Sequence, residues 1–191
     1  MTEDPIGFLG GSINLYRYAD NQPNNSTDPD GLDTIVMVFW NNADHTGFIG
    51  EHSAVFVTND GHPVLYDPSG DSRINGYHPT NDIFLDEDAD LEQYLHAHGS
   101  QNPDTYPEVF DFDTTPEQEK EIAERIKNLG HLGSFNCADA VSSVLKGIGP
   151  FKDLGHNYKP AALAKELREL ELPVIPRIAL RRLKPNLSPP Q

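Results

Sequence analysis

Among its 191 residues the chain has one cysteine, Cys137, and this is the strongest nucleophile that the sequence offers. Asn136, directly before it, is a residue type that favours the N-cap of a helix, so the sulfur is expected at or near the first helical position. Unpaired backbone N–H groups and the helix dipole there favour a thiolate and lower the pKa of the thiol. Position alone leaves an alternative open, namely that Cys137 is a small buried apolar side chain.

Two further side chains are candidates for completing a cysteine-based site. His52 stands immediately before a predicted strand at 53–57, and an imidazole, which titrates near pH ~6.5, suits a general base. Asp67 ends the next predicted strand, 63–67. If the turn at 59–62 makes these strands a hairpin, Asp67 returns to the end of the sheet where His52 lies and can orient its ring. The alternatives are that His52 is one of eight ordinary histidines and that Asp67 only begins the turn after it.

The elements expected to position these side chains are strands and helices in mixed order. β-Branched and aromatic runs predict strands at 34–40, 53–57, 63–67 and 108–112. Apolar residues at helical spacing predict helices at 88–98, 116–129, 136–146 and 160–170. Thr115 is expected to cap the second helix and Gly130 to end it. The fold class that follows is α+β, a small, mostly antiparallel sheet packed by helices.

Charge and composition exclude several classes of protein. The formal net charge is −16, which disfavours binding along a nucleic-acid backbone. This negative charge reflects either ordinary solubility or complementarity to a basic inhibitor or to a basic cage that encloses the chain as cargo. No apolar run approaches the ~20 residues of a membrane span, so stable membrane insertion is not expected. The first residues do not form a signal peptide, so export is expected to depend on a larger parent protein or a secretion machine. One cysteine allows neither an internal disulfide nor a Cys-rich zinc site, and no cofactor is expected.

The first 32 residues resemble the closing segment of an Rhs-repeat shell, the delivery part of polymorphic toxins. An ordered set of turn-rich blocks carries this resemblance: 4–7 (DPIG), 11–18 (GSINLYRY), 21–24 (NQPN) and 28–32 (DPDGL). The resemblance implies that a complete shell cuts its chain between Leu32 and Asp33, with Asp4 and Asp28 as the protease acids, because paired carboxylates can activate water. Without the rest of the shell no self-cleavage is expected. The alternative is two ordinary Asp-Pro turns.

Residues from about 34 to 170 resemble circularly permuted papain-like hydrolases, similar to the NlpC/P60 superfamily and its lecithin:retinol acyltransferase-like relatives. The resemblance rests on His52 at the opening of a strand, a following strand that ends in a polar residue, and Asn136-Cys137 at the opening of a helix. It implies a permuted papain-like fold with Cys137 as nucleophile, His52 as base and Asp67 as third member, a position that varies within the family. Asn136 is expected to cap the helix rather than to bind an oxyanion.

The resemblances predict 1–32 as the end of the Rhs core and 33–172 as the toxin domain. The prolines and the excess of basic residues in 173–191 predict a proline-rich basic tail. The function they imply is a secreted antibacterial or anti-host toxin that is delivered into a target cell. It would act as a cysteine-dependent hydrolase or acyltransferase on an amide, peptide or acyl bond. Peptidoglycan, a host protein and a lipid ester all remain open as substrates. The expected partners are the Rhs shell, a secretion machine such as type VI, and a cognate immunity protein.

Two other classes of function remain open beside this one. The first is a non-cysteine toxin such as a metal-dependent nuclease, with a structural Cys137 and with His78 and His98 among its candidate residues. No His-Glu-x-x-His pattern supports it, and the acidic run 86–90 lacks the ligand pattern of an EF-hand, so it is expected to be a solvated helix start. The second is a binding module that blocks a process by contact.

Overall fold

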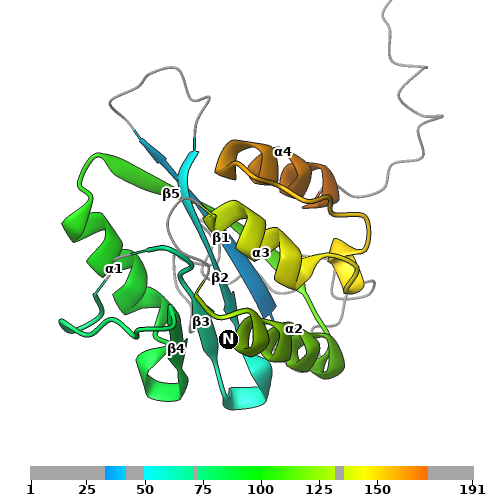
Figure 1. The fold of residues 1–191 in the computed structure, drawn as a ribbon, viewed down its shortest axis with the longest axis horizontal. Helices are drawn as coiled ribbons and strands as arrows, with labels where there is room; N and C mark the ends of the chain where they lie inside the picture. Colours follow the sequence, from blue (N-terminus) through cyan, green and yellow to red (C-terminus); the bar gives the residue numbers. More distant parts are fainter. Residues whose placement is uncertain (1–32, 42–49, 71–72, 132–135, 172–191) are drawn as a thin grey trace, which may run out of the picture.

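The structure is a computed structural model that describes residues 33–41, 50–70, 73–131 and 136–171 (Figure 1). The Rhs-like segment 1–32, which contains Asp4, Asp28 and Leu32, lies outside the described residues, and so does the basic tail 173–191. A strand begins at Asp33.

One antiparallel sheet organises the described part of the chain. Its strands are β1 (Asp33–Asn41), β2 (Gly50–Val57), β3 (Val64–Tyr66), β4 (Ile83–Leu85) and β5 (Thr105–Asp113). They lie in the order β4-β3-β2-β1-β5, and each neighbouring pair is antiparallel. The predicted α+β class is therefore confirmed. Strand β4 is absent from the sequence prediction because a run of three residues is too short to show a period.

The helices are α1 (Leu91–Gln101), α2 (Pro116–Leu129), α3 (Cys137–Leu145) and α4 (Pro160–Glu171). The capping box predicted at Thr115 is present. The start predicted for the first helix is wrong: 86–88 forms a 3-10 turn, and α1 begins after Asp90, whose side chain accepts from the backbone N–H of Gln93. None of the helices that the structure describes has the length and apolar character needed to cross a bilayer.

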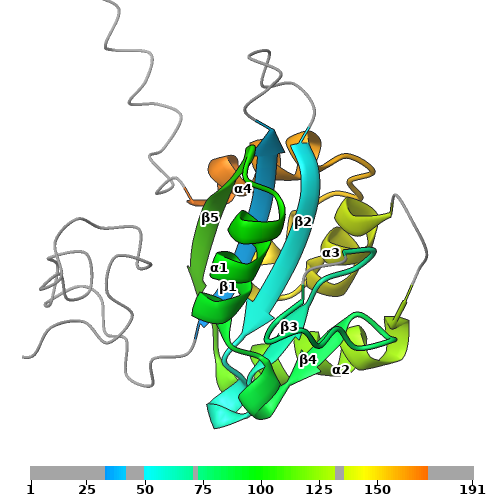
Figure 2. The ribbon, with the colours of Figure 1, turned by 90° about the vertical axis from the view of Figure 1, so that its left-hand side faces the viewer.

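Helices cover both faces of the sheet, as Figures 1 and 2 show: α2, α3 and α4 lie on one face and α1 on the other. Because successive side chains of a strand point to opposite faces, β1 contributes to two separate cores. Val36 and Val38 belong to the core shared with α2–α4, whereas Ile35, Met37 and Phe39 belong to the core shared with α1. The central strands β1 and β2 are therefore fixed from both sides.

A buried carboxylate joins α2 to the sheet. Glu119 is fully buried, and its Oε1 accepts hydrogen bonds from the hydroxyls of Thr58 (2.8 Å) and Thr114 (3.1 Å). Replacing Glu119 with Ala is expected to lower the free energy of unfolding by roughly 2–4 kcal/mol, because both hydroxyls lose their acceptor and a cavity remains. Urea unfolding at neutral pH measures this loss.

The same helix offers a matched control. Glu121 is half exposed and pairs with Arg125 at 2.6 Å, one turn further along. Because exposed ion pairs contribute little, Glu121→Ala is expected to cost less than about 0.5 kcal/mol. Equal losses from the two substitutions would contradict a structural role for the buried Glu119.

Candidate active site

His52 is the third residue of β2 and lies opposite Phe39 of β1. The prediction that it stands just before the strand is therefore wrong. Backbone pairing with β1 continues past the apolar run 53–57 and reaches Gly50, with a register shift between Phe39 and Trp40. The ring of His52 stacks on Phe39 with 5.9 Å between centroids, so both its backbone and its ring are held by the sheet.

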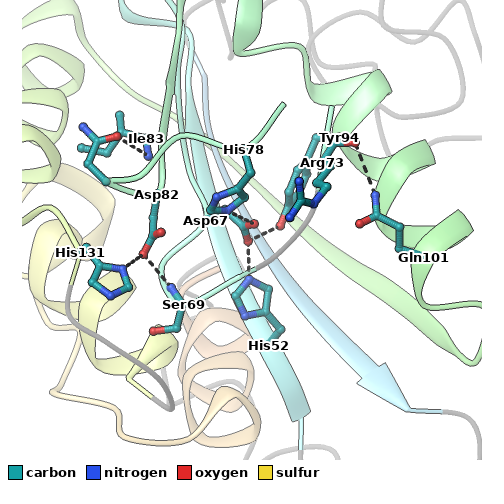
Figure 3. Close-up of polar contacts among 11 residues, drawn as sticks. His52, Asp67, Ser69, Arg73, His78, Asp82, Ile83, Tyr94, Gln101 and His131 are labelled. Atoms are coloured by element: carbon teal, nitrogen blue, oxygen red, sulfur yellow. Dashed lines mark hydrogen bonds and ion pairs between the residues drawn. The ribbon is translucent and has the colours of Figure 1, made fainter. Parts of the chain in front are cut away.

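Asp67 follows β3 directly, and the predicted hairpin brings it to His52. The register pairs Val55 with Tyr66, so Asp67 lies beside the part of β2 that carries His52. The Oδ1 atom of Asp67 is 2.5 Å from Nε2 of His52, and the Asp67 side chain is fully buried (Figure 3). A carboxylate in this position fixes the orientation of the imidazole and stabilises its cation.

Two more side chains converge on the carboxylate of Asp67 (Figure 3). The hydroxyl of Tyr94, from α1, donates to Oδ1 at 2.7 Å, and Nε2 of His78 lies 3.9 Å from Oδ2. Burial raises the pKa of Asp67, but the charge of His52 and the hydrogen bonds from His52 and Tyr94 outweigh it, so the pKa is lowered. Asp67 is thus held as a carboxylate although it has no contact with solvent.

The thiol of Cys137 approaches the same imidazole from α3. Cys137 is the first residue of that helix, as predicted, and is 7% exposed. Burial raises the pKa of the Cys137 thiol, but a hydrogen bond with His52, the charge of that ring and hydrogen bonds from Ser53 outweigh it, so the pKa is lowered. Burial lowers the pKa of His52, but Asp67 and Cys137 together raise it to about 10.

Cys137 comes from the face of the sheet covered by α3, whereas His52 points to the face covered by α1. The shortness of β3 explains how the two side chains meet. Ser53 is fully buried and is one of the residues that lower the pKa of Cys137, whereas His52 stacks on Phe39 in the opposite core. Within the described residues, β3 pairs with β2 only at Val55–Val57, so β2 has an open edge from 50 to 54. The start of α3 can therefore reach around this edge to His52.

Asn136 occupies the N-cap position of α3, as predicted, but its side chain makes no capping hydrogen bond. Its φ of −113° and ψ of 16° differ from the extended conformation of Asp90 and Thr115, whose side chains do cap their helices. An N-cap residue needs the extended conformation to turn its side chain back onto the helix. The interpretation of Asn136 as a side-chain cap is therefore wrong.

The histidines considered as metal ligands lie around the same site. His98 stacks on Phe39 with 3.7 Å between centroids, and His78 faces Asp67. Across the described ranges, no group of three or more His, Cys, Asp or Glu side chains is placed to hold a metal ion. In this structure His78 lies beside Asp67, and His98 lies beside His52.

Tyr94 and Ser53 are site residues that sequence reasoning did not identify, and it considered His78 only for the metal-dependent alternative. The one signal is that Leu91, Tyr94, Leu95 and His98 recur at helical spacing, which predicts that they share the buried face of the helix expected at 88–98. Nothing in that spacing shows that the Tyr94 hydroxyl reaches a carboxylate 27 positions away in the chain. Such contacts depend on how α1 packs on the sheet.

Gly70 is packed against the carboxylate of Asp67, and its N–H donates to the Asp67 carbonyl at 3.0 Å. A Cβ at this position would overlap the carboxylate group. Gly70→Ala is therefore expected to displace Asp67, to lower the rate at which iodoacetamide alkylates Cys137, and to reduce stability by roughly 1–3 kcal/mol. Intact-mass kinetics and urea unfolding measure the two effects.

Gly99 is the matched control for Gly70. It lies inside α1, and a Cβ there has no atom within 4 Å. Gly99→Ala is expected to leave alkylation unchanged and to raise stability by about 0.5–1 kcal/mol through helix propensity. Normal alkylation in Gly70→Ala would show that Asp67 tolerates displacement.

A cavity of about 440 Å³ lies beside α1 and residues 73–76 of the loop between β3 and β4. Arg73, Gln93, His96 and Gln101 are among its lining residues. None of Cys137, His52 and Asp67 lines this cavity, so it is separate from the candidate site.

The site thus draws three side chains from three elements: His52 from β2, Asp67 from the end of β3 and Cys137 from the start of α3. The chemistry of these groups, and not a relative, is what identifies the site. Comparison with known proteins found no family model, no curated protein and no solved structure that matches the chain.

Proposed function

We propose that this chain contains a cysteine hydrolase or acyltransferase that acts on an amide, peptide or acyl bond. One observation carries the proposal: the imidazole of His52 hydrogen-bonds to a buried carboxylate and interacts with the only thiol of the chain. The raised pKa of His52 and the lowered pKa of Cys137 both favour an imidazolium–thiolate pair. Such a pair is an activated nucleophile with its acid already in place.

The chemistry proceeds by two acyl transfers. The Cys137 thiolate adds to the carbonyl carbon of the substrate, and the negative charge moves to the carbonyl oxygen. Backbone N–H groups at the start of α3 are suitable donors for that oxyanion. When the tetrahedral adduct collapses, the bond to the leaving group breaks and the His52 imidazolium gives its proton to that group. A thioester on Cys137 and a neutral His52 remain.

The second half returns the site to its starting state. Neutral His52 takes a proton from water, or from an acceptor alcohol or amine, which attacks the thioester carbonyl. The carbon–sulfur bond breaks, Cys137 leaves as a thiolate, and His52 is again an imidazolium. Water gives hydrolysis and an acceptor gives acyl transfer. Throughout both halves Asp67 holds the ring by Nε2, which leaves Nδ1 as the nitrogen for these proton transfers.

The topology supports a permuted papain-like architecture. The histidine strand comes first, its hairpin partner is followed by the carboxylate, and the cysteine begins a helix that packs on the sheet. This is the order that the resemblance to permuted NlpC/P60-like enzymes implies. The same fold serves different substrates, so the bond that is cleaved belongs to the proposal only as a class.

The biological setting is the second part of the proposal. The Rhs-like segment 1–32 suggests that the enzyme is toxin cargo, released after Leu32, secreted and delivered into a bacterial competitor or a host cell. A cognate immunity protein that occludes Cys137 would then protect the producing cell. The formal charge of −16 makes a basic surface on that protein the natural complement.

Growth of bacteria that express the chain without an immunity protein tests the proposal. The full chain is directed either to the cytoplasm or to the periplasm, in parallel with Cys137→Ala and Cys137→Ser. We expect growth arrest in one compartment for the wild type and normal growth for both variants at equal protein levels. Full toxicity of Cys137→Ala would contradict the proposal, and loss of that toxicity with a chelator would favour a metal-dependent enzyme instead.

A further inference from the structure

A second buried carboxylate, Asp82, lies just ahead of β4 and is 3% exposed. Its backbone carbonyl accepts a hydrogen bond from the N–H of Asp67 at 2.9 Å. Its side-chain Oδ2 accepts from the N–H of Ser69 at 3.0 Å (Figure 3). Asp82 therefore fixes the backbone at Asp67 and again at Ser69, two residues later, and so holds the segment that carries the carboxylate orienting His52.

The same Oδ2 atom also meets a residue from the other half of the site. Nδ1 of His131 lies 2.7 Å from it, and His131 comes directly after Gly130, the residue that ends α2 (Figure 3). Cys137 follows six positions later in the chain. A second contact joins the end of β3 to the end of α2: the hydroxyl of Tyr66 donates to the carbonyl of Gly130 at 2.5 Å.

The backbone at Asp82 and Ser69 has an unfavourable conformation, which the hydrogen bonds of the Asp82 side chain stabilise. Asp82 and Ser69 both have a φ of 62°, in the left-handed region that residues other than glycine seldom adopt. Such conformations persist where surrounding contacts determine them, and they gather at functional sites. Here the two strained residues hydrogen-bond to each other next to Asp67.

We propose that Asp82 and His131 form a clasp that sets the position of Cys137 relative to the His52–Asp67 pair. The inference rests on the proposed function, since it concerns the assembly of that site. One partner of the clasp is bonded to the loop after Asp67, and the other lies at the head of the segment that leads to Cys137. Asp82 and His131 are positioning residues: they touch neither the thiol nor the ring that activates it.

The test uses the full chain with His131→Ala and Asp82→Asn, and it reads the rate of Cys137 alkylation by iodoacetamide as a function of pH. Because the chain has one cysteine, intact mass reports this thiol alone. His131 is half exposed, so its loss should leave the fold intact. We expect the rate at pH 7 to fall about tenfold and the profile to move to higher pH, because a small misplacement of paired groups is costly.

A matched His–Asp pair elsewhere provides the control. His62 and Asp86 lie 3.1 Å apart and are both well exposed, on the turn before β3 and the end of β4. His62→Ala and Asp86→Asn should leave the profile unchanged. Thermal unfolding is measured for all four variants, because a purely structural role would lower the melting temperature without moving the pH profile of the thiol.

The outcomes separate the two proposals. Suppose that the wild-type alkylation rate has its transition at low pH and that folded His131→Ala gives the same pH profile. This result overturns the clasp and leaves the proposed function standing. A wild-type profile of an ordinary thiol overturns both, since there is then no activated pair to position. Should Asp82→Asn lose its fold, His131→Ala alone decides.

Discussion

Replacing His52 with Ala is expected to make Cys137 nearly inert toward iodoacetamide at pH 7. In the wild type, His52 and Ser53 outweigh burial and lower the pKa of the thiol below its ordinary value of 9.0. Without the imidazole, burial remains, and burial raises the pKa of the thiol. Each unit of that rise removes about nine-tenths of the thiolate at neutral pH, so a loss of at least about tenfold in rate is expected.

Initial rates from intact-mass spectra at a fixed reagent concentration measure this effect. His62→Ala serves as the control, because His62 is an exposed histidine whose partner is Asp86 and not a site residue. The control should alkylate at the wild-type rate. If His52→Ala reacts as fast as the control, the imidazole does not activate the thiol, and the proposed mechanism is wrong.

Replacing Asp67 with Asn is expected to cause the largest loss of stability together with a loss of thiol reactivity. Asp67 is fully buried, accepts hydrogen bonds from His52 and Tyr94, and lies near His78. Asn keeps the shape but removes the charge, so the buried imidazolium loses its counter-ion. Removing one partner of a buried ion pair costs roughly 3–5 kcal/mol. The pKa of His52 should then fall, because burial lowers it and Asp67 no longer opposes burial.

The stability difference between wild type and Asp67→Asn has a defined pH window. His52 has a pKa raised from 6.5 to about 10, so its contribution is complete below pH 6.5 and is lost as the pH rises through about 10. Asp67 has a lowered pKa, so its contribution is complete above its ordinary value of 3.8 and is lost as the pH falls through the lowered pKa. The difference should therefore be largest between pH 3.8 and 6.5, remain substantial at pH 7, and shrink above about pH 10.

Urea unfolding at pH 5, pH 7 and above pH 10 tests this window. Asp86→Asn is the matched control, because it removes an exposed carboxylate that also faces a histidine. Its effect should be small at every pH, as for other exposed ion pairs. A constant cost of Asp67→Asn across the whole range would show that the loss comes from packing and not from the charged pair.

The sequence predicted the parts of the site that local patterns determine. The predicted hairpin correctly places Asp67 near His52, because a turn between two apolar runs determines which strand ends meet. The residue type of Asn136 predicted a helix start there, and this placed Cys137 correctly at the first helical position. The predicted capping hydrogen bond from the Asn136 side chain is absent, because a favourable residue type does not ensure the extended backbone that capping needs.

The remaining contacts depend on tertiary packing and leave no pattern in a single sequence. Tyr94 lies on a predicted buried face, but its bond to Asp67 requires α1 to cross the sheet at one particular place. Asp82 and His131 are 49 positions apart, in a loop and at a helix end, where periodicity carries no information. His52 was placed outside its strand because a polar residue paired through its backbone does not extend an apolar run.

The central claim is that Cys137 and His52 form an imidazolium–thiolate pair, and the pH profile of alkylation in the wild-type chain tests it most directly. The rate constant for iodoacetamide is measured from pH 4 to pH 10 by intact mass, with Cys137→Ser as the blank. The claim predicts that the alkylation rate rises with a midpoint below 9.0, the ordinary value for a thiol, and then reaches a plateau. A single transition at or above 9.0 would contradict it.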